Sequence, residues 1–310
     1  MSELPALGLE LWVVLAVAAA LAQTTRNAAA QTIASRIPAT LNSWSRFAFC
    51  LPFAAVTCAV IVARSGLPTY SPAFFGLCLC TAVAQLTANV ALMTAFRRGS
   101  FGESIIFHKL EVILTAIAGA IWFAELPSIM GAAGIGVCGV GVLVINLARD
   151  DASSRLRRAF RFGPAGGYAL TCAVLLVIAS FALKGANAAL VAESETRSYF
   201  ESAVHTLFHT TWIEVALLSV WIGWREPESF RAVPIHWRRM LLIGSAGFIA
   251  SLGWFWAYSL TLVAYVKAVG QIEALIAVAL GIRMLGERAL LRQLPGILLV
   301  VLGITLVLLG

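Results

Sequence analysis

Charged side chains are scarce in this chain, and their scarcity excludes an ordinary soluble fold. Asp, Glu, Lys and Arg make up 12% of the 310 residues, whereas hydrophobic residues make up 60% and the mean hydropathy is +0.90. A soluble domain usually carries about twice that charged fraction. Because so few polar groups are available to cover a surface, lipid must be the solvent for much of the chain. The sequence therefore predicts an all-α integral membrane protein.

Several patterns that carry chemistry are also missing. The sequence contains no P-loop, no HExxH zinc motif and no CxxC pair, and its two aspartates, Asp150 and Asp151, are adjacent in one polar linker. No Ser-His-Asp arrangement is therefore expected, and we predict a protein that is not an enzyme and needs no cofactor. The six cysteines lie within apolar runs, where they are expected to be buried free thiols that act as small hydrophobic groups.

Apolar runs of spanning length follow one another along the chain. Each is long enough, at about 1.5 Å per residue, to cross most of a hydrocarbon core about 30 Å thick. The first run resembles a secretory signal, but no Lys or Arg precedes Arg26, so it is expected to remain as the first helix. The ten predicted transmembrane helices cover residues 8–26, 40–63, 71–96, 102–123, 128–147, 164–187, 199–223, 238–260, 262–283 and 293–309.

Two stretches of the chain repeat at a fixed offset of 162 residues. The matching residues include Glu111 with Glu273, Glu125 with Glu287, and Gly141 with Gly303. Each repeat contains five predicted helices, and because five is odd, the second repeat must insert upside down relative to the first. The predicted organisation is a five-helix repeat over 1–148, a basic linker over 149–163 and a second five-helix repeat over 164–310.

The arginines predict the orientation in the bilayer. Two of them, Arg64 and Arg197, fall in the even-numbered loops of the ten-helix topology. The odd-numbered loops hold Arg26, Arg36, Arg97, Arg98, Arg149, Arg155, Arg157, Arg158, Arg161, Arg225, Arg231, Arg238, Arg239, Arg283, Arg288 and Arg292. Because loop cations favour the cytoplasm, we predict a multi-pass protein of the inner (plasma) membrane with cytoplasmic odd-numbered loops. The net charge of +7, distributed in this way, does not indicate a nucleic-acid partner.

All three lysines lie inside predicted helices, and so do two repeat-related glutamates. Ionisable groups are costly in a membrane, and they usually pair, face a water-filled cavity and serve transport. Glu111 and Glu273 each lie about ten residues into a helix, roughly 15 Å deep and near the midplane. Lys109 and Lys267 are their natural counter-charges. We predict these four residues for substrate binding or coupling. The alternative is an ionic link that only holds two helices together.

Neighbouring polar and aromatic residues extend the candidate site. Gln271 shares a helix face with Lys267, and His108 shares one with Glu111. Further candidates for the wall of a cavity that holds a polar or amphipathic solute are Gln85, Asn89, Trp254, Tyr258 and Lys184. Interfacial anchoring and helix packing are the alternatives for the aromatic pair. For Lys184, the alternative is that the side chain snorkels from the end of its helix towards the membrane surface.

One predicted helix carries a stripe with the chemistry of metal ligands. Glu201, His205 and His209 follow one another at intervals of four residues, which suggests a zinc-transport hypothesis. The chain has only four histidines, and no partner cluster is evident elsewhere. A metal or organic-cation transporter that uses this stripe is therefore kept as the alternative function, and no bound metal is predicted.

Each repeat ends in the same pattern. An apolar helix finishes in Ala124-Glu125 or Gly286-Glu287, and a turn leads into a glycine-rich helix without charge, which is expected to pack closely rather than to line a cavity. The two glutamates are expected to be structural, as helix caps or bridges. This pattern resembles the EamA-like family of the drug/metabolite transporter superfamily. The resemblance covers nearly the whole chain and is clearest over 101–145 and 263–307.

The resemblance implies a ten-helix inverted-repeat carrier that moves amino acids, other metabolites or drugs. Such carriers work by exchange or with a proton, often outward, and helices 3, 4, 8 and 9 line the cavity. The predicted partners are a small-molecule substrate, the lipid bilayer and protons as a candidate coupling ion, and no oligomer is required. The presence of both signs of charge in the interior favours a polar or zwitterionic solute.

Overall fold

A computed structural model of the chain describes residues 10–98, 104, 107–149, 163–193, 198–276, 279 and 287–310. In this part of the chain, every element of secondary structure longer than one residue is helical. The elements are α1 (Leu11–Gln31), α2 (Ala39–Ala48), α3 (Leu51–Ser65), α4 (Pro72–Arg98), α6 (Glu111–Trp122), α7 (Ile129–Arg149), α9 (Pro164–Ala192), α10 (Tyr199–Arg225), η1 (Pro227–Ala232), α11 (Val233–Leu260), α12 (Val263–Gly270) and α14 (Glu287–Leu309).

The predicted all-α fold class is confirmed, because each of the ten predicted helices overlaps a helical segment. Among the described residues, seven segments are long and apolar enough to cross a membrane. One of them joins α2 and α3 across residues 39–65. These two helices meet at Phe49 and Cys50, just before Pro52, whose nitrogen cannot donate a hydrogen bond to a continuing helix.

The predicted helices 102–123 and 262–283 are each divided at a turn residue. Leu110 is a turn residue between the helical residues 107–109 and α6, and Gln271 is a turn residue between α12 and the helical residues 272–276. Both turn residues keep right-handed helical dihedral angles. Each break therefore interrupts the hydrogen-bond pattern of the helix, while the backbone remains a right-handed helix. Both breaks adjoin ionisable or polar side chains, which is where a membrane protein tolerates irregular backbone buried in protein.

The chain folds into two compact units, and each unit contains parts of both sequence repeats. Unit 1 comprises Met1–Val83 and Ala182–Leu260, and unit 2 comprises Ala84–Phe181 and Thr261–Gly310. Helices α4 and α9 each continue from one unit into the other. The predicted repeats, 1–148 and 164–310, are defined by sequence similarity, whereas the two units are defined by contacts in space. The units therefore do not test the repeat boundaries, which stay a prediction. Residues 150–162 of the predicted linker lie outside the described residues.

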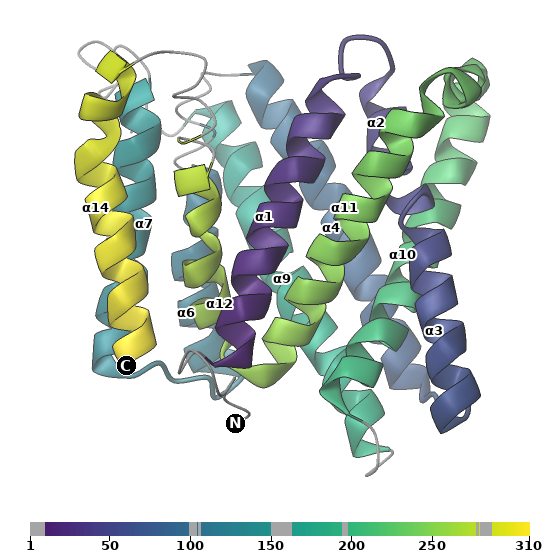
Figure 1. Ribbon diagram of the computed structural model, residues 1–310, viewed down its shortest axis with the longest axis horizontal. Coiled ribbons are helices and arrows are strands. Elements are labelled where there is room, and N and C mark those ends of the chain that lie inside the picture. The colour runs from purple at the N-terminus through teal and green to yellow at the C-terminus, as the bar shows by residue number, and fades with distance from the viewer. Residues whose placement is uncertain are drawn as a thin grey trace. The chain divides into compact units, whose positions relative to one another are not determined.

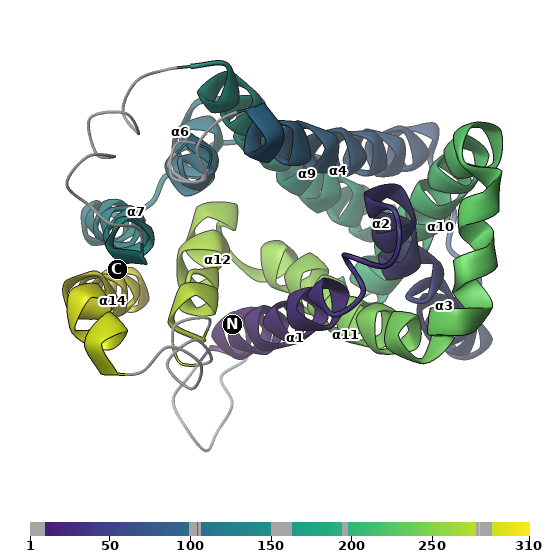
Figure 2. The ribbon, with the colours of Figure 1, turned by 90° about the horizontal axis from the view of Figure 1, so that it is seen from above.

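Unit 1 is held together by long helix–helix contacts. Helix α1 packs along α11, and α10 packs against α2, α3 and α11 (Figures 1 and 2). Gly253 permits the close approach of α11 to α1, because a Cβ there would lie 2.9 Å from the Cβ of Ala19 and 3.1 Å from the carbonyl oxygen of Leu15. A buried apolar cluster at one end of the unit includes Leu41 and Met240.

Unit 2 is organised by α7 and α14, the last helices of the two repeats, which lie side by side (Figures 1 and 2). A Cβ on Gly134 would lie 2.7 Å from the carbonyl oxygen of Gly303, and a Cβ on Gly141 would lie 2.9 Å from that of Gly296. Early positions of one helix meet late positions of the other, so the two helices run antiparallel. The predicted close packing of the glycine-rich helices is confirmed.

The same contacts show how the two repeats are related within unit 2. At the 162-residue offset, Gly134 corresponds to Gly296 and Gly141 to Gly303. The contact between Gly134 and Gly303 is therefore equivalent, under the repeat, to the contact between Gly296 and Gly141. Two further contacts join a residue to its own equivalent. The Cys138 thiol lies 3.8 Å from the carbonyl oxygen of Val300, and Lys109 lies next to Gln271.

A residue can touch its own equivalent only near a two-fold axis. Antiparallel helices that meet in this way are what an inverted repeat requires. The inverted relation that the odd helix count predicts is therefore present in the contacts of unit 2.

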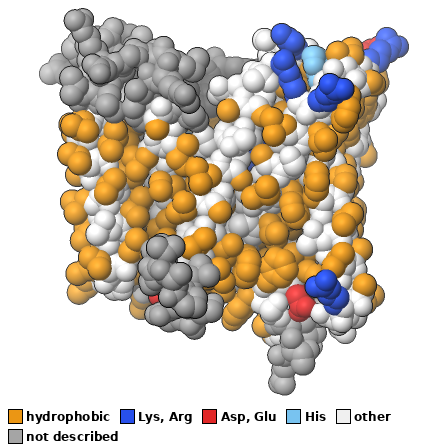
Figure 3. Space-filling model, in the orientation of Figure 1, with side chains coloured by type: hydrophobic (Ala, Val, Ile, Leu, Met, Phe, Trp, Pro, Cys, Tyr) orange, Lys and Arg blue, Asp and Glu red, His pale blue; other side chains and the backbone are white. Residues whose placement is uncertain are grey.

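The surface is that of a protein surrounded by lipid. On the face shown in Figure 3, hydrophobic side chains cover the helices between their ends, and Lys and Arg lie at the ends. Val56, Val90 and Val220 are 65%, 66% and 73% exposed, which suits contact with acyl chains. Five of the six cysteines are buried, as predicted, but Cys80 on α4 is exposed.

Several arginines that the sequence analysis assigned to loops lie within helices. Arg98 ends α4, and Arg238 and Arg239 lie in the first turns of α11. The assignment of Arg26 is wrong, because this residue belongs to α1 and is only 6% exposed. Its guanidinium donates to Asn27 Oδ1 at 3.2 and 2.9 Å. Arg26 therefore no longer counts among the cations of the odd-numbered loops. The orientation in the bilayer stays a prediction.

The glycine contacts predict the effect of one methyl group. Gly141→Ala is expected to destabilise the protein by about 1–3 kcal/mol, because the added Cβ would lie 2.7 Å from the backbone nitrogen of Val300. Gly136→Ala on the same helix is the control, since nothing lies within 4 Å of a Cβ there. Thermal unfolding in lipid–detergent micelles measures both. Equal midpoints for the two variants would contradict the packing described here.

Candidate functional site

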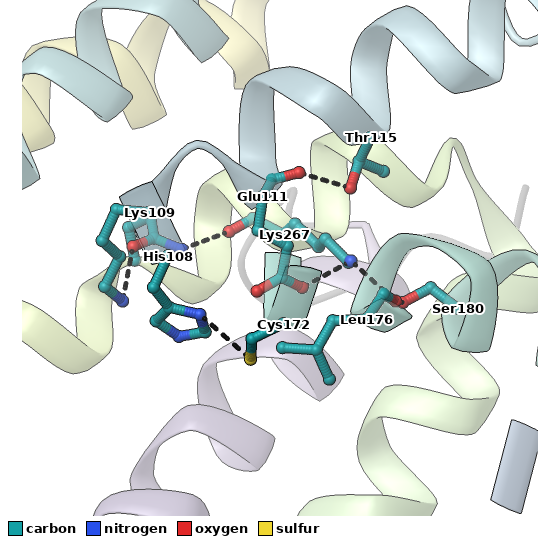
Figure 4. A network of polar contacts seen from close by, with 9 residues as sticks. His108, Lys109, Glu111, Thr115, Cys172, Leu176, Ser180 and Lys267 are labelled. Carbon is teal, nitrogen blue, oxygen red and sulfur yellow. Dashed lines mark hydrogen bonds and ion pairs between the residues drawn. The ribbon is translucent and has the colours of Figure 1, made fainter. Parts of the chain in front are cut away.

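Ionisable side chains gather in unit 2 where α6, α9 and α12 approach one another (Figure 4). Lys267 of α12 donates from Nζ to Glu111 Oε1 of α6 at 2.6 Å. The same ammonium group donates to the carbonyl oxygen of Leu176 on α9 at 3.4 Å. The side chains of the pair are 6% and 19% exposed, so the ion pair is largely withdrawn from solvent.

The local backbone favours these charges. Glu111 lies in the first turn of α6, where backbone N–H groups favour a carboxylate, and Lys267 lies in the last turn of α12, where carbonyl groups favour a cation. Two hydroxyl groups hold the surrounding carbonyls. Thr115 donates to the carbonyl oxygen of Glu111 at 2.7 Å, and Ser180 donates to that of Leu176 at 2.7 Å.

A second polar contact lies at the break in the two helices. Lys109 donates from Nζ to Gln271 Oε1 at 3.3 Å. The amide nitrogen of Gln271 donates in turn to the carbonyl oxygen of Lys267 at 3.1 Å. Gln271 therefore links both lysines, and it does so at the place where the repeat-equivalent positions 109 and 271 meet.

His108 completes the cluster. Its Nδ1 lies 3.6 Å from the Cys172 thiol on α9 (Figure 4). The charged groups that interact electrostatically with its ring are Glu111, Lys109, Lys267 and Glu273. We give the name ion network to the six residues His108, Lys109, Glu111, Lys267, Gln271 and Glu273. It contains two lysines and two glutamates.

The structure thus brings together six of the predicted site residues, all within unit 2. Gln85 and Asn89 are half-buried on the part of α4 that belongs to unit 2, and no hydrogen bond between described residues joins them to the ion network. In unit 1, Trp254 donates from Nε1 to Gln23 Oε1 at 3.2 Å and stacks on Tyr258, with the ring centroids 6.1 Å apart.

The aromatic pair therefore links α11 to α1, which agrees with its packing interpretation. Lys184 is half-buried on α9.

Glu125 acts as a helix cap. Its Oε2 accepts a hydrogen bond at 2.9 Å from the backbone nitrogen of Val263, the first residue of α12. This agrees with the structural role expected from the sequence and fixes the start of the helix that carries Lys267. The side chain of its repeat partner, Glu287, lies outside the described residues.

The predicted metal stripe on α10 does not form a cluster of ligands. Glu201 and Ser198 make a capping box at the start of the helix. His205 Nδ1 lies 2.9 Å from the Tyr70 hydroxyl, and the ring of His209 lies 4.8 Å from the ring of the same tyrosine. Among the described residues, no group of three His, Cys, Asp or Glu side chains could hold a metal ion.

Sequence reasoning missed one buried carboxylate. Glu214 lies in the middle of α10 and is 2% exposed. Arg46 of α2 interacts with it electrostatically. A glutamate deep inside an apolar run is the signal that could have identified it.

The ion pair predicts an asymmetry between single and double substitutions. Glu111→Gln leaves the buried ammonium of Lys267 without its counter-charge, so a loss of about 3–5 kcal/mol is expected. The double variant Glu111→Gln with Lys267→Met removes both charges and should regain most of that loss. Thermal or denaturant unfolding of the three proteins measures the difference. A single variant as stable as wild type would show that the two groups are solvated and not paired.

Comparison with known proteins identifies one family and one similar fold. The model of the EamA-like transporter family matches residues 169–309, which confirms the resemblance over that part of the chain. A solved structure titled "Crystal structure of protein" shares the fold, with a TM-score of 0.68 and 17% identity over 96% of each chain. No curated protein matches.

EamA-like transporters are known for ten-helix inverted repeats and are not enzymes. The chain therefore carries an EamA-like transporter domain at residues 169–309, and it is a multi-pass membrane transporter of a small molecule.

Proposed function

We propose that the protein is a secondary active transporter of a polar or zwitterionic solute, such as an amino acid, and that the ion network of unit 2 binds this solute. The observation that carries the proposal is the buried pair of Lys267 and Glu111, 2.6 Å apart. It lies beside the contact between Lys109 and Gln271, where repeat-equivalent positions meet. Transporters with inverted repeats bind their substrates where the repeats meet.

Stability alone does not account for the pair. Replacing a buried ion pair by well-packed hydrophobic residues is often neutral or stabilising. Ionisable residues inside membrane segments are rare, and they commonly mark substrate or ion pathways. A role in transport therefore accounts for the ion network better than a purely ionic link between α6 and α12.

The balance of charge in the ion network favours a solute with both signs. The ammonium group of a zwitterion can take the place of Lys267 at Glu111, while its carboxylate takes the place of Glu111 at Lys267. Each protein charge then exchanges one partner for another and is never left alone in a medium of low dielectric constant. A simple anion or cation would leave one member of the pair uncompensated.

The energy source is a gradient and not nucleotide hydrolysis, because the sequence contains no P-loop. A proton or a second solute moved in exchange supplies the driving force. The arginine distribution supports a plasma-membrane location with cytoplasmic odd-numbered loops.

A stabilisation screen followed by transport tests this function. Purified protein is heated with a library of amino acids and other polar metabolites, because a solute that binds the folded state raises the unfolding midpoint. The solute that stabilises is then radiolabelled, and its uptake into proteoliposomes is measured. We expect uptake to fall about a hundredfold in Glu111→Gln, as for a lost buried charge contact.

Glu228→Gln is the matched control. Glu228 is exposed in η1, where it pairs with Arg231, so uptake should be unchanged. Full uptake by both Glu111→Gln and Glu273→Gln would exclude the ion network as the binding site.

A further inference from the structure

One face of α10 carries a line of buried polar side chains. Ser202, Thr206, Thr210 and Glu214 follow one another at intervals of four residues, so they share a face and span about 18 Å of helix. Their exposed fractions are 0%, 0%, 1% and 2%. We call these four residues the α10 stripe. All of them belong to unit 1, and none belongs to the ion network.

Most of the α10 stripe lacks hydrogen-bond partners within the described part of the chain. Thr206 Oγ1, Thr210 Oγ1 and Glu214 Oε1 are all buried without a partner there. Ser202 donates to the carbonyl oxygen of Asn187 at 2.7 Å, and the side-chain oxygen of Asn187 is again buried without a partner.

Each such group costs about 1–3 kcal/mol unless something satisfies it. Ordered water commonly does so in folded proteins. Three such oxygens along α10, and a fourth on the neighbouring Asn187 of α9, therefore indicate a hydrated line through unit 1.

Cationic groups surround the inner end of the stripe. Arg46 of α2 interacts electrostatically with Glu214, and the Cys50 thiol interacts with Glu214, Arg46 and Arg26. The two arginines pack on the same glycine of α11. A Cβ on Gly247 would lie 3.5 Å from Arg26 Cδ and 3.8 Å from Arg46 Cγ.

Cysteine thiols and a histidine of the described neighbouring segments also lie along the stripe. The Cys58 thiol of α3 lies 3.4 Å from Nδ1 of His205 on α10. The thiol of Cys78 on α4 interacts weakly with the Thr210 side chain without reaching the geometry of a hydrogen bond. Glu214 thus has Arg46 at its own level and hydroxyl groups along the stripe.

We propose that the α10 stripe is a proton path and that Glu214 is the group that binds the proton at its inner end. The proton enters near Ser202 at the start of α10. Hydroxyl groups and the water between them pass it along, because each can accept one hydrogen bond while it donates another. The proton then bonds to a carboxylate oxygen of Glu214 and makes a neutral acid. Arg46 keeps its charge, so the net charge at this level rises by one.

This proposal deepens the proposed function and rests on it in one respect, because it gives the transporter a binding group for a coupling ion. It does not require the ion network of unit 2. A neutral Glu214 no longer attracts Arg46, so proton binding changes the electrostatic contact between α10 and α2.

Thiol labelling tests whether water reaches the stripe. The starting protein is Cys80→Ser, which replaces the exposed cysteine and leaves five buried ones. Thr210→Cys in this protein should react with a small water-soluble methanethiosulfonate in membrane vesicles about tenfold faster than Ile222→Cys, because a thiolate forms only where water has access.

Ile222 is a matched control. It is 0% exposed on the same helix, but it lies on another face and packs in the apolar cluster with Leu41 and Met240. Equal labelling rates for the two cysteines would overturn the path.

Infrared spectroscopy in lipid tests the proton-binding group directly. The difference spectrum between low and high pH should contain the C=O stretch of a protonated carboxylic acid that shifts in D2O. Glu214→Gln should remove this band, and the exposed Glu228→Gln should leave it. A band that survives in Glu214→Gln at an unchanged unfolding midpoint, or no titrating band at all, would overturn the assignment. Neither measurement needs the transported solute, so its result is independent of the uptake test.

Discussion

The hydrocarbon core of the bilayer is the constraint on which the rest of this structure depends. It offers no hydrogen bonds, so backbone groups must satisfy one another, and helices result. It also makes unpaired charge costly, so ionisable side chains inside the membrane segments must find partners. The buried ammonium of Lys267 meets this requirement twice, through Glu111 and through the carbonyl oxygen of Leu176.

The inverted repeat brings ionisable and polar side chains from both halves of the sequence together in one cluster. Antiparallel α7 and α14 approach through glycines that exchange under the repeat. The breaks near Leu110 and Gln271 then place side chains of both repeats in one cluster. The site is not symmetric, because Lys109 has a glutamine as its equivalent. In the proposed carrier, unequal residues at equivalent positions would hold the solute differently in each half as the protein alternates between its two faces.

Much of this could be predicted from the sequence, because periodic patterns report on periodic structure. The length of the apolar runs predicted the helices, and the matched glutamates predicted the repeat. The pairing of Glu111 with Lys267 followed from the cost of charge in lipid.

The helix breaks at Leu110 and Gln271 could not be predicted from the sequence, because neither position is a proline or glycine, the residues that usually mark a helix break. Arg26 was misplaced because a cation near the end of an apolar run looks like a loop residue. The spacing of Glu201, His205 and His209 predicts metal chemistry on this helix and gives no indication of a role for Glu214.

We propose that the solute takes over the partners of the Lys267–Glu111 pair. The most direct test is an experimental structure of the protein with the solute that stabilises it. The account predicts that the amine of the solute lies against Glu111, that its carboxylate lies against Lys267, and that the 2.6 Å contact between the two side chains is lost. A solute bound elsewhere, with that contact intact, would contradict the account.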